Sequence, residues 1–468
     1  MSLAAPTARP SPAEAQCLAA TDAQVLAARR DMFKSFCSLL ESEGIAYVIL
    51  AGYQRYPDHI DSDVDFLVSE ADFQGLPALF RRPDAIPNAR LLQALQHETS
   101  ACYYVFAQVV GERLAYLHPD AAASYRRKGR LWLDSQTVLA SRRQHAAGFW
   151  VPAPEVEFEY YFVKRVDKAL VEPTHLAQLA ALVANAGPAC QAVLERLMGQ
   201  QRTPDILQAI SRTDAAWFAE QRDALRQALS QTLSAEPWPA RIKNHLADLR
   251  RQWARVRRPT GLVIAVLGPD GSGKTTVIEH LERELAPAFR RVTRFHLRPH
   301  FGKVRQGQAV DNPHGQLPRG AAASGIKLGM FVVDYLWGWM RWVGPARVRS
   351  TFVVFDRYIH DMQVDPMRYR LPKGFVWAKR AAACVPRPDM WLVLDAQPEL
   401  LVARKGEISL DAARQLSAGY RRLAATLPNS VLIDSAQPLH QTLAQAVSTL
   451  RDALEARCAQ RSESRIPA

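Results

Sequence analysis

The stretch GPDGSGKTT, residues 268–276, carries the clearest chemical pattern in the sequence. It matches G-x-x-x-x-G-K-[ST], in which glycines let backbone N–H groups converge on phosphate oxygens. Lys274 is expected to reach the β- and γ-phosphates of ATP, and the hydroxyl of Thr275 to hold Mg²⁺. We therefore predict an ATP-binding loop that consists of Gly268, Asp270, Gly271, Ser272, Gly273, Lys274, Thr275 and Thr276.

Two further segments carry charged side chains that suit the same chemistry. Asp356 and Arg357 directly follow an apolar run, where an aspartate is suited to order Mg²⁺ and an arginine to bind a second phosphate. Arg404 and Lys405 end a helical segment that follows another apolar run. Phosphoryl transfer builds negative charge, so basic residues that close over the transferred group are expected. The alternative for Arg404 and Lys405 is a pair of solvated basic residues at a helix end.

A separate acidic pattern, DSDVDFLV, occupies residues 61–68. On a strand, Asp63 and Asp65 share a face, and adjacent carboxylates repel unless a cation lies between them. Asp120, which follows an apolar run, is the candidate third acid of such a Mg²⁺ site. The alternative is a solvated acidic loop edge. Lys164 and Lys168, one helical turn apart, are candidate phosphate contacts of this domain, and a solvated helix face is the favoured interpretation.

The elements around the phosphate-binding loop have the arrangement that it needs. Residues 262–267 form an apolar, β-branched run that predicts a buried strand, and residues 276–285 have apolar side chains on one helical face. Further apolar runs, at 352–355, 391–394 and 431–433, alternate with helical segments. This alternation predicts an α/β fold in which helices cover both faces of a parallel sheet. A chance match on a glycine turn is the alternative, and the flanking strand and helix argue against it.

The N-terminal part predicts a different architecture. A helical pattern from residue 21 to 43 is followed by strand patterns at 46–50, 63–68, 103–110 and 113–118, as in a small α+β domain. From Pro154 the pattern is helical, and a basic stretch at 241–258 leads to the phosphate-binding loop. We expect a disordered lead-in (1–20), an α+β domain (21–150), a helical connector (151–258), a P-loop domain (259–458) and a tail (459–468).

Composition limits the class of protein. The 468 residues are 48% hydrophobic and 22% charged, which is typical of globular domains. The net charge of +13 suits phosphorylated substrates or an anionic membrane surface, and we find no clear nucleic-acid-binding motif. Six scattered cysteines fit a reducing cytoplasm, so a cytoplasmic protein is expected. The apolar run 328–343 carries two charges, which favours a buried or interfacial helix over a transmembrane segment; peripheral membrane contact and oligomerisation stay open.

Taken together, the C-terminal motifs resemble the thymidylate kinase family. The resemblance rests on GPDGSGKTT, VVFDRY and PDMWLVLDAQPELLVARK, and it covers the chain from Gly261 to about residue 456. It implies that Asp270 contacts the sugar of a nucleotide acceptor, that Arg357 holds the acceptor phosphate, and that Arg404 and Lys405 form a basic lid. The segment 328–342 lacks the pattern of that family's base-binding helix, so the acceptor is left open.

Two other resemblances concern shorter segments. Residues 48–68 resemble the nucleotidyltransferase fold of the polymerase β type, which implies Mg²⁺ held by Asp63, Asp65 and Asp120; Tyr53 stands where that fold has glycine or serine. The segments DNPHGQLPRG and DRYIHDMQVDPMRYR resemble a divergent branch of thymidylate-kinase-like proteins that is linked with bacterial surface polysaccharide synthesis.

We therefore expect an enzyme that uses ATP and Mg²⁺ to move the γ-phosphoryl group to a small acceptor, such as a nucleoside monophosphate or a sugar. The expected catalytic residues are Lys274, Asp356, Arg357, Arg404 and Lys405. Two alternatives stay open. One is a non-catalytic ATP-binding scaffold or regulator, and the other is nucleotidyl transfer in the N-terminal domain.

Overall fold

The computed structural model describes residues 20–127, 130–232, 238–299, 320–372, 376–405 and 409–463. Two compact units are distinguished. One is built mainly on the chain from Trp253 onward, and the other on Leu26–Gln108 and Ala115–Gln252. Residues 1–19 of the predicted lead-in and 464–468 of the predicted tail lie outside the described residues, whereas 459–463 belong to a helix rather than to a tail.

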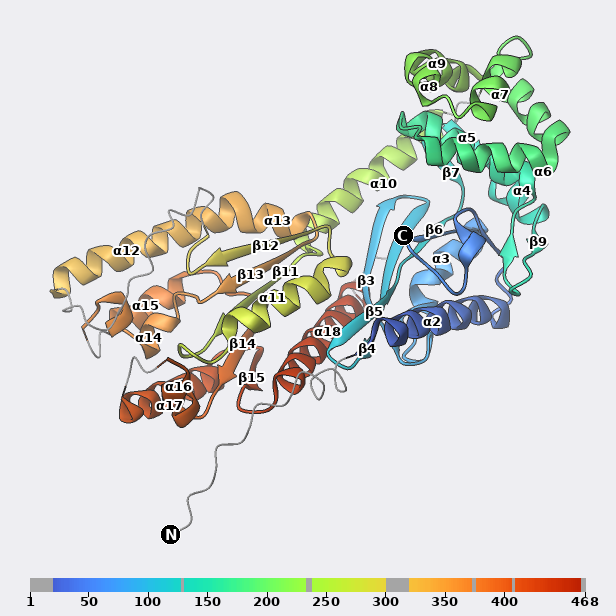
Figure 1. The fold of residues 1–468 in the computed structure, drawn as a ribbon. Coiled ribbons are helices and arrows are strands. Elements are labelled where there is room, and N and C mark those ends of the chain that lie inside the picture. The colour runs from blue at the N-terminus through green and yellow to red at the C-terminus, as the bar shows by residue number, and fades with distance from the viewer. Residues whose placement is uncertain are drawn as a thin grey trace, which may run out of the picture. The chain divides into compact units, whose positions relative to one another are not determined.

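The first unit, the P-loop unit, contains a five-stranded parallel sheet in the order β12–β13–β11–β14–β15 (Figure 1). Its strands are β11 (Leu262–Leu267), β12 (Arg291–His296), β13 (Thr351–Asp356), β14 (Met390–Asp395) and β15 (Ser430–Asp434). The sequence predicts all of these strands except β12. The chain passes from β13 across β11 to β14, and in open α/β sheets such a switch places ligands beyond the carboxyl ends of the strands.

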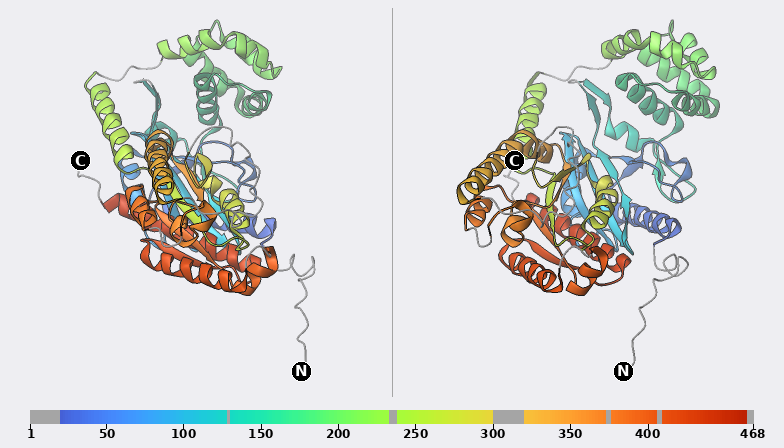
Figure 2. Two further views of the ribbon diagram at one scale, coloured as in Figure 1. Left: turned by 90° about the vertical axis from the view of Figure 1, so that its left-hand side faces the viewer. Right: turned by 60° about the vertical axis from the view of Figure 1, so that its left-hand side comes forward.

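Helices lie on both sides of this sheet, as the two views in Figure 2 show. On one side α11 packs against α18, and elsewhere α17 packs against β14 and α14. The helices are α11 (Lys274–Leu285), α12 (Ala321–Gly338), α13 (Gly344–Val348), α14 (Asp361–Val364), α15 (Trp377–Cys384), α16 (Pro398–Lys405), α17 (Leu410–Thr426) and α18 (Leu439–Glu463). Short turns η2 (Ala286–Ala288), η4 (Trp339–Val343) and η5 (Met367–Tyr369) accompany them.

The core of the P-loop unit explains why β11 is apolar along its whole length. All its residues are buried, and Val263, Ala265 and Leu267 share one cluster with Leu328 and Tyr335 of α12. Because side chains alternate along a strand, the remaining residues of β11 are buried on the opposite face. The strand is therefore covered on both sides, as expected in a parallel sheet. α12 itself is half-buried, since its other face is exposed.

The second unit begins with α2 (Asp22–Ser42) and a sheet in the order β1–β2–β6–β4–β3, with β5 paired to β4. Its strands are β1 (Tyr47–Ile49), β2 (Val64–Val68), β3 (Ala89–Glu98), β4 (Ala101–Val110), β5 (Arg113–Leu117) and β6 (Pro119–Ala122). β2 and β6 run parallel, and Asp65 lies opposite Asp120 in their register. Shorter elements are η1 (Tyr53–Arg55), α3 (Glu70–Leu79), α4 (Ser135–Ala140) and the strand pairs β7–β8 (Tyr125–Arg127, Arg130–Leu133) and β9–β10 (Arg143–Gln144, Trp150–Val151).

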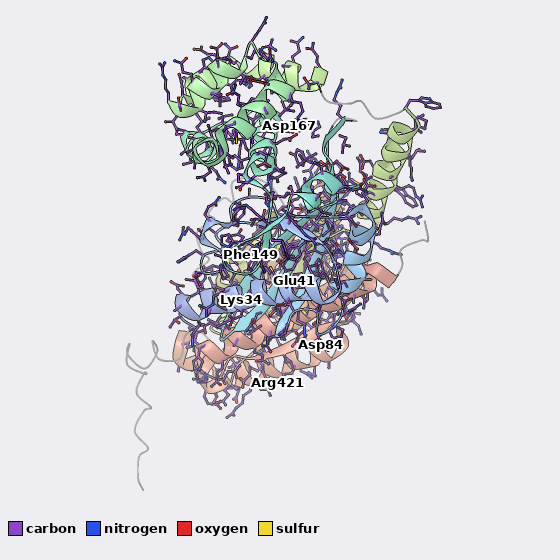
Figure 3. The ribbon with its side chains drawn as sticks, turned by 90° about the vertical axis from the view of Figure 1, so that its right-hand side faces the viewer. Lys34, Glu41, Asp84, Phe149, Asp167 and Arg421 are labelled. Atoms are coloured by element: carbon purple, nitrogen blue, oxygen red, sulfur yellow. The ribbon has the colours of Figure 1, made fainter. Side chains whose placement is uncertain are left out.

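Aromatic side chains hold α2 against the following loops. Phe33 of α2 meets Phe149, labelled in Figure 3, edge-on with ring centroids 5.3 Å apart. Phe36, one helical turn further, meets Phe66 of β2 at 5.0 Å. These pairs fix the helix to the strand that carries Asp65, because such edge-to-face contacts add to the burial of each ring.

Helices complete the second unit. They are α5 (Pro154–Lys168), α6 (Pro173–Met198), α7 (Thr203–Ser211), α8 (Ala215–Glu220), α9 (Arg222–Thr232) and the part of α10 (Trp238–Arg257) that precedes Trp253. Among the described helices, α6 alone has the length and apolar composition to cross a membrane. It packs against α5, α7 and α9, and Leu176, Leu179 and Leu194 are buried in their common core.

Candidate active site

The phosphate-binding loop leaves β11 at Gly268 and enters α11 at Lys274. Gly268, Gly271 and Gly273 have φ angles of 145°, 84° and 88°, which residues with side chains rarely adopt. A Cβ atom at Gly268 would lie 3.0 Å from the carbonyl oxygen of Leu394. The loop therefore needs glycine to turn into the N-terminus of α11, where the helix dipole favours a phosphate.

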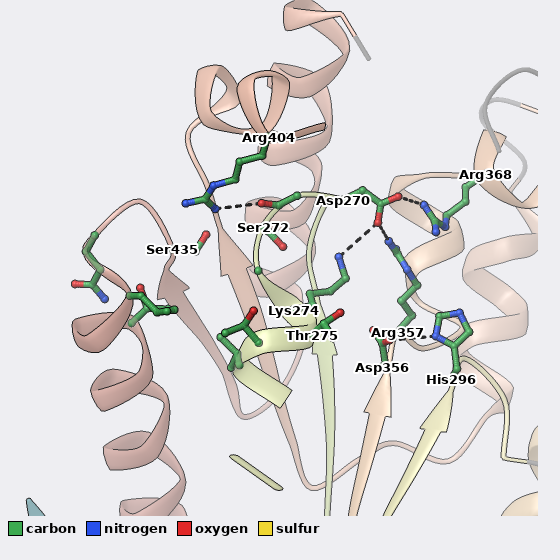
Figure 4. A pocket seen from close by; sticks show the side chains of 17 residues that line it. Asp270, Ser272, Lys274, Thr275, His296, Asp356, Arg357, Arg368, Arg404 and Ser435 are labelled. Atoms are coloured by element: carbon green, nitrogen blue, oxygen red, sulfur yellow. Dashed lines mark hydrogen bonds and ion pairs between the residues drawn. The ribbon is translucent and has the colours of Figure 1, made fainter. Parts of the chain in front are cut away.

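A cavity of about 600 Å³ lies beside this loop (Figure 4). Its size is within the range of small-ligand sites. Predicted residues from three segments line it: Asp270, Gly271, Ser272, Gly273, Lys274, Thr275, Thr276, Asp356, Arg357 and Arg404. Residues without a predicted role also line it, namely Val277, His296, Arg368, Ser435, Gln437, Leu439 and Thr442. The fold thus brings the predicted loop, strand-end and lid segments to one cavity.

Lys274 is almost fully buried at the base of this cavity. Its Nζ donates to the carbonyl oxygens of Gly268 at 2.9 Å and Pro269 at 2.8 Å, and it lies 3.7 Å from a carboxylate oxygen of Asp270. Burial, followed by the nearby Arg357 charge, lowers the pKa of Lys274 to about 7. An added negative charge such as a phosphate would therefore favour the protonated amine.

Asp270 lies between two arginines. Its carboxylate oxygens accept from Arg357 and from Arg368, which η5 contributes. Burial alone would raise the pKa of Asp270, but Arg357, Lys274 and Arg368 together hold it well below its usual value. The carboxylate is therefore charged at neutral pH, and it neutralises part of a strongly basic pocket wall.

Arg357 has the backbone conformation expected of a functional position. Its φ of 71° is unusual for a residue with a side chain, and its N–H donates to the carbonyl oxygen of Val266 at 3.1 Å. The guanidinium is buried and pairs with Asp361, which also accepts from the hydroxyls of Tyr369, at 2.7 Å, and Tyr420. Asp361 is fully buried, so this cluster fixes the arginine at the cavity wall.

Asp356 ends β13 and points to the cavity beside His296. The Nδ1 atom of His296 lies 3.2 Å from Oδ2 of Asp356, and a guanidinium nitrogen of Arg294 lies 3.9 Å from it. Burial would raise the pKa of Asp356, but His296 and the nearby Lys274 and Arg357 lower it below its usual value. The carboxylate is thus available as an acceptor for water molecules around a cation.

Arg404 reaches the loop from α16. Its Nη1 donates to the carbonyl oxygen of Gly271 at 3.1 Å, and most of its side chain is exposed. Lys405 is the last residue of α16, and its side chain lies outside the part of the chain that the structure describes. The structure therefore brings Arg404 to the loop and gives no contact for Lys405.

The residues present fit ATP with Mg²⁺. The Oγ atom of Ser272 is buried beside the loop and has no hydrogen-bond partner within the described residues, so an acceptor such as a phosphate oxygen would satisfy it. Thr275 and Asp356 supply a hydroxyl and a carboxylate to the same cavity. Across the described ranges, no group of three or more His, Cys, Asp or Glu side chains could hold a metal ion. A Mg²⁺ ion at this cavity would accordingly depend on phosphate and water oxygens, which is its usual preference.

The N-terminal carboxylates also come together. Asp63 accepts from the Tyr103 hydroxyl at 2.9 Å, and Asp65 accepts from Lys164 Nζ at 2.6 Å. Burial, followed by the charges of Asp120 and Asp65, raises the pKa of Asp63. Lys164 is mostly buried in this contact, so its interpretation as a solvated residue is wrong. Tyr53, in turn, donates to Glu157 of α5.

Sequence reasoning missed His296, Arg368 and Asp361. His296 ends the edge strand β12, where only Phe295 is buried, so no apolar run marks it. Arg368 and Asp361 lie between two recognised motifs, in DRYIHDMQVDPMRYR, and their roles depend on contacts with Asp270 and Arg357. The sequence did offer one signal for Arg368, which is a basic residue that follows Asp356 and Arg357 at the end of β13, eleven residues after Arg357.

Comparison with known proteins supports a nucleotide kinase. The chain is 30% identical over 212 residues to a protein named thymidylate kinase from Xanthomonas campestris pv. campestris (strain B100), covering 42% of this chain and 86% of that protein. It is 29% identical over 219 residues to the thymidylate kinase of Xanthomonas oryzae pv. oryzae (strain PXO99A), with the same coverage. A probable thymidylate kinase of Pyrobaculum aerophilum is 30% identical over 142 residues, which cover 30% of this chain and 68% of that protein. No protein-family model matches the chain. Over the matched part, the chain belongs to the thymidylate kinase family.

Proposed function

We propose that the P-loop unit transfers the γ-phosphoryl group of ATP to a small acceptor that carries a phosphate or a hydroxyl. The observation that carries this proposal is the convergence of Lys274, Asp356 and Arg357 on one cavity beside the loop. Kinship with thymidylate kinases supports a nucleotide kinase in general terms.

The donor side of the cavity is formed by the loop. ATP bound with Mg²⁺ would supply the phosphoryl group and the divalent charge that balances its oxygens. The backbone N–H groups of the loop and Lys274 would bind the β- and γ-phosphates, and the buried hydroxyl of Ser272 would donate to them. Thr275 and Asp356 would hold the metal and its waters.

The acceptor side is formed by the arginines around Asp270. Arg357 and Arg368 present two fixed guanidinium groups, which suit bidentate binding of a phosphate. Asp270 would then accept a hydrogen bond from an acceptor hydroxyl. Arg404, which already contacts the loop, would stabilise the charge that develops during transfer, and we propose Lys405 of the same segment as its partner.

The identity of the acceptor is a separate proposal. Membership of the family favours a nucleoside monophosphate. The segment 328–342 lacks the pattern of the family's base-binding helix, and for this reason we also propose a sugar or sugar phosphate as a candidate acceptor. The link with surface polysaccharide synthesis rests on the resemblance of two segments, of which 311–319 lies outside the described residues. A cytoplasmic location stays a prediction.

The proposal is tested by comparing Lys274→Ala with Lys379→Ala in an assay of ATP consumption. Lys379 is an exposed lysine of α15 outside the cavity, so its substitution controls for the loss of a positive charge. Products from a panel of nucleoside monophosphates and sugars are identified by mass. We expect Lys274→Ala to lose turnover and Lys379→Ala to keep it. ATP binding without turnover for every acceptor would instead indicate the scaffold alternative.

A second candidate activity, nucleotidyl transfer, is favoured by one observation in the other unit. Asp65 lies opposite Asp120 in the β2–β6 register, and burial, followed by the charges of these two carboxylates, raises the pKa of Asp63. We propose that Asp63, Asp65 and Asp120, on a nucleotidyltransferase-like fold, bind Mg²⁺ only together with a nucleotide, whose phosphate oxygens would complete a site that these acids do not form by themselves within the described ranges. Pyrophosphate release should then be lost in Asp63→Ala and kept in Lys274→Ala. Asp58→Ala, which removes an exposed carboxylate nearby, is the control.

A further inference from the structure

The helix α10 presents a continuous row of exposed apolar side chains. Their exposed fractions run from 48% to 72%, and the row consists of Trp238, Ile242, Leu246, Leu249, Trp253 and Val256. Steps of three or four residues place them on one side of a helix. Scattered single apolar residues are normal on a protein surface, whereas a contiguous row of them marks an interaction surface.

A second row along α10 is basic. Lys243, Arg250 and Arg257 recur every seventh residue, so they form a line beside the apolar row, and all three are exposed. Arg257 lies over the ring of Trp253 at 3.8 Å, which ties the two rows together. The sequence of α10 contains one acidic residue, Asp248, and it pairs with Arg251 at 3.0 Å. No carboxylate of α10 therefore balances the basic row.

A partner that covers this face of α10 must offer apolar contacts to one row and negative charge to the other. An anionic bilayer offers both an apolar layer for the Trp, Leu and Ile side chains and lipid phosphates for the basic row. Tryptophans favour the boundary between these layers, and long basic side chains can extend to the headgroups. α10 carries too many charges to span the bilayer, so it would lie in the interface plane.

We propose that α10, the yellow-green helix of Figure 1, docks the protein on a membrane that contains anionic lipids. A second copy of the helix is less suited, because two such helices would bring basic rows together without acids to pair them. A nucleic acid would match the basic row but would leave the apolar row exposed to water. The proposal does not depend on the proposed phosphotransfer, which uses no residue of α10.

The test is co-sedimentation of the full chain with vesicles of phosphatidylcholine, with and without phosphatidylglycerol. We expect binding to the vesicles that contain phosphatidylglycerol, weakened by added salt. Replacing two basic residues, Lys243→Gln with Arg250→Gln, should weaken binding about fivefold for each charge removed. Replacing two apolar residues, Leu249→Gln with Trp253→Gln, should weaken it at least tenfold.

Trp377→Ala is the matched control. Trp377 is 57% exposed, close to the 56% of Trp253, and it also carries an arginine over its ring. It should bind vesicles like the parent protein. Because all substituted residues are exposed, unchanged thermal unfolding will show that the variants are folded.

Four results would overturn the proposal. The first is no sedimentation with anionic vesicles, and the second is equal binding by the parent and both α10 double variants. The third is a protein that does not bind vesicles but is a dimer in light scattering, and that becomes a monomer in the Leu249→Gln, Trp253→Gln double variant. A second copy of the chain, and not a membrane, would then cover α10. Retention on DNA in place of vesicles would likewise contradict it.

Discussion

Asp361 offers the most informative single substitution, because three donors converge on its carboxylate. It is fully buried and accepts from Arg357, Tyr369 and Tyr420. Asp361→Asn keeps the shape but removes the charge, and its amide NH₂ would face one of the donors. Of the two ion pairs that the described residues make with the buried guanidinium, only the one with Asp270 then remains.

The expected magnitude follows from these contacts. Breaking a buried ion pair costs about 3–5 kcal/mol, and each hydrogen bond to a charged group contributes about 1.5–3 kcal/mol. These terms overlap, so we expect a loss of about 3–5 kcal/mol from the free energy of unfolding of the P-loop unit. For a unit of this size that corresponds to a fall of about 6–20 °C in its Tm.

Thermal unfolding followed by circular dichroism, with and without ATP and Mg²⁺, measures this loss. Tyr369→Phe removes one donor and leaves the ion pair, so it should lower the Tm by a smaller amount. If the Tm of Asp361→Asn lies within about one degree of that of the parent protein, the buried cluster does not hold Arg357 in place, because leaving a buried charge without its ion-pair partner should lower the free energy of unfolding far more than that.

Three further predictions concern the cavity. Burial lowers the pKa of Lys274 to about 7, so the unfolded chain binds more protons than the folded one between pH 7 and the usual lysine value. This group therefore destabilises the fold most below pH 7, and Lys274→Met should raise the Tm at pH 6–7 by an amount that shrinks toward pH 10; a constant difference would contradict the shift. Gly268→Ala should lower stability and ATP binding more than Gly273→Ala, because a Cβ meets Leu394 and Ser272 at the first site and nothing within 4 Å at the second. Equal losses in calorimetric ATP binding would refute this reasoning. Arg368→Ala should raise the KM for the acceptor and leave the KM for ATP unchanged, since Arg368 meets the loop at the carboxylate of Asp270, which we assign to the acceptor side. A change in the KM for ATP alone would instead place Arg368 on the donor side.

The strands at the centre of the P-loop sheet could be predicted because burial on both faces leaves an apolar run. β11, β13 and β14 show this pattern, and their ends locate the loop and Asp356. β12 lies at the sheet edge and has only two apolar residues, Val292 and Phe295, so it leaves only a weak signal. β15 lies at the opposite edge but was predicted, because its residues Val431, Leu432 and Ile433 form an apolar run that β12 lacks.

Contacts between distant segments limited the prediction of the site. Arg368 meets Asp270 across 98 residues of sequence, and Lys164 meets Asp65 across 99. Neither pair is implied by spacing, because both depend on how helices pack beside strand ends. For the same reason Lys164 was assigned to a solvated face. Motifs that act through local backbone geometry, such as the glycine loop, are predictable, whereas partners brought by tertiary packing are not.

The carboxylate of Asp270 has a consequence for which anions enter the site. It is tethered between Arg357 and Arg368, so any anion that binds these arginines must exchange with it. A tethered group competes at a high effective concentration, which disfavours small free anions such as inorganic phosphate. An acceptor that brings a hydroxyl together with its phosphate gives the displaced carboxylate a new hydrogen bond. We therefore expect an acceptor that carries both a phosphate and a hydroxyl to bind this pocket more tightly than inorganic phosphate does.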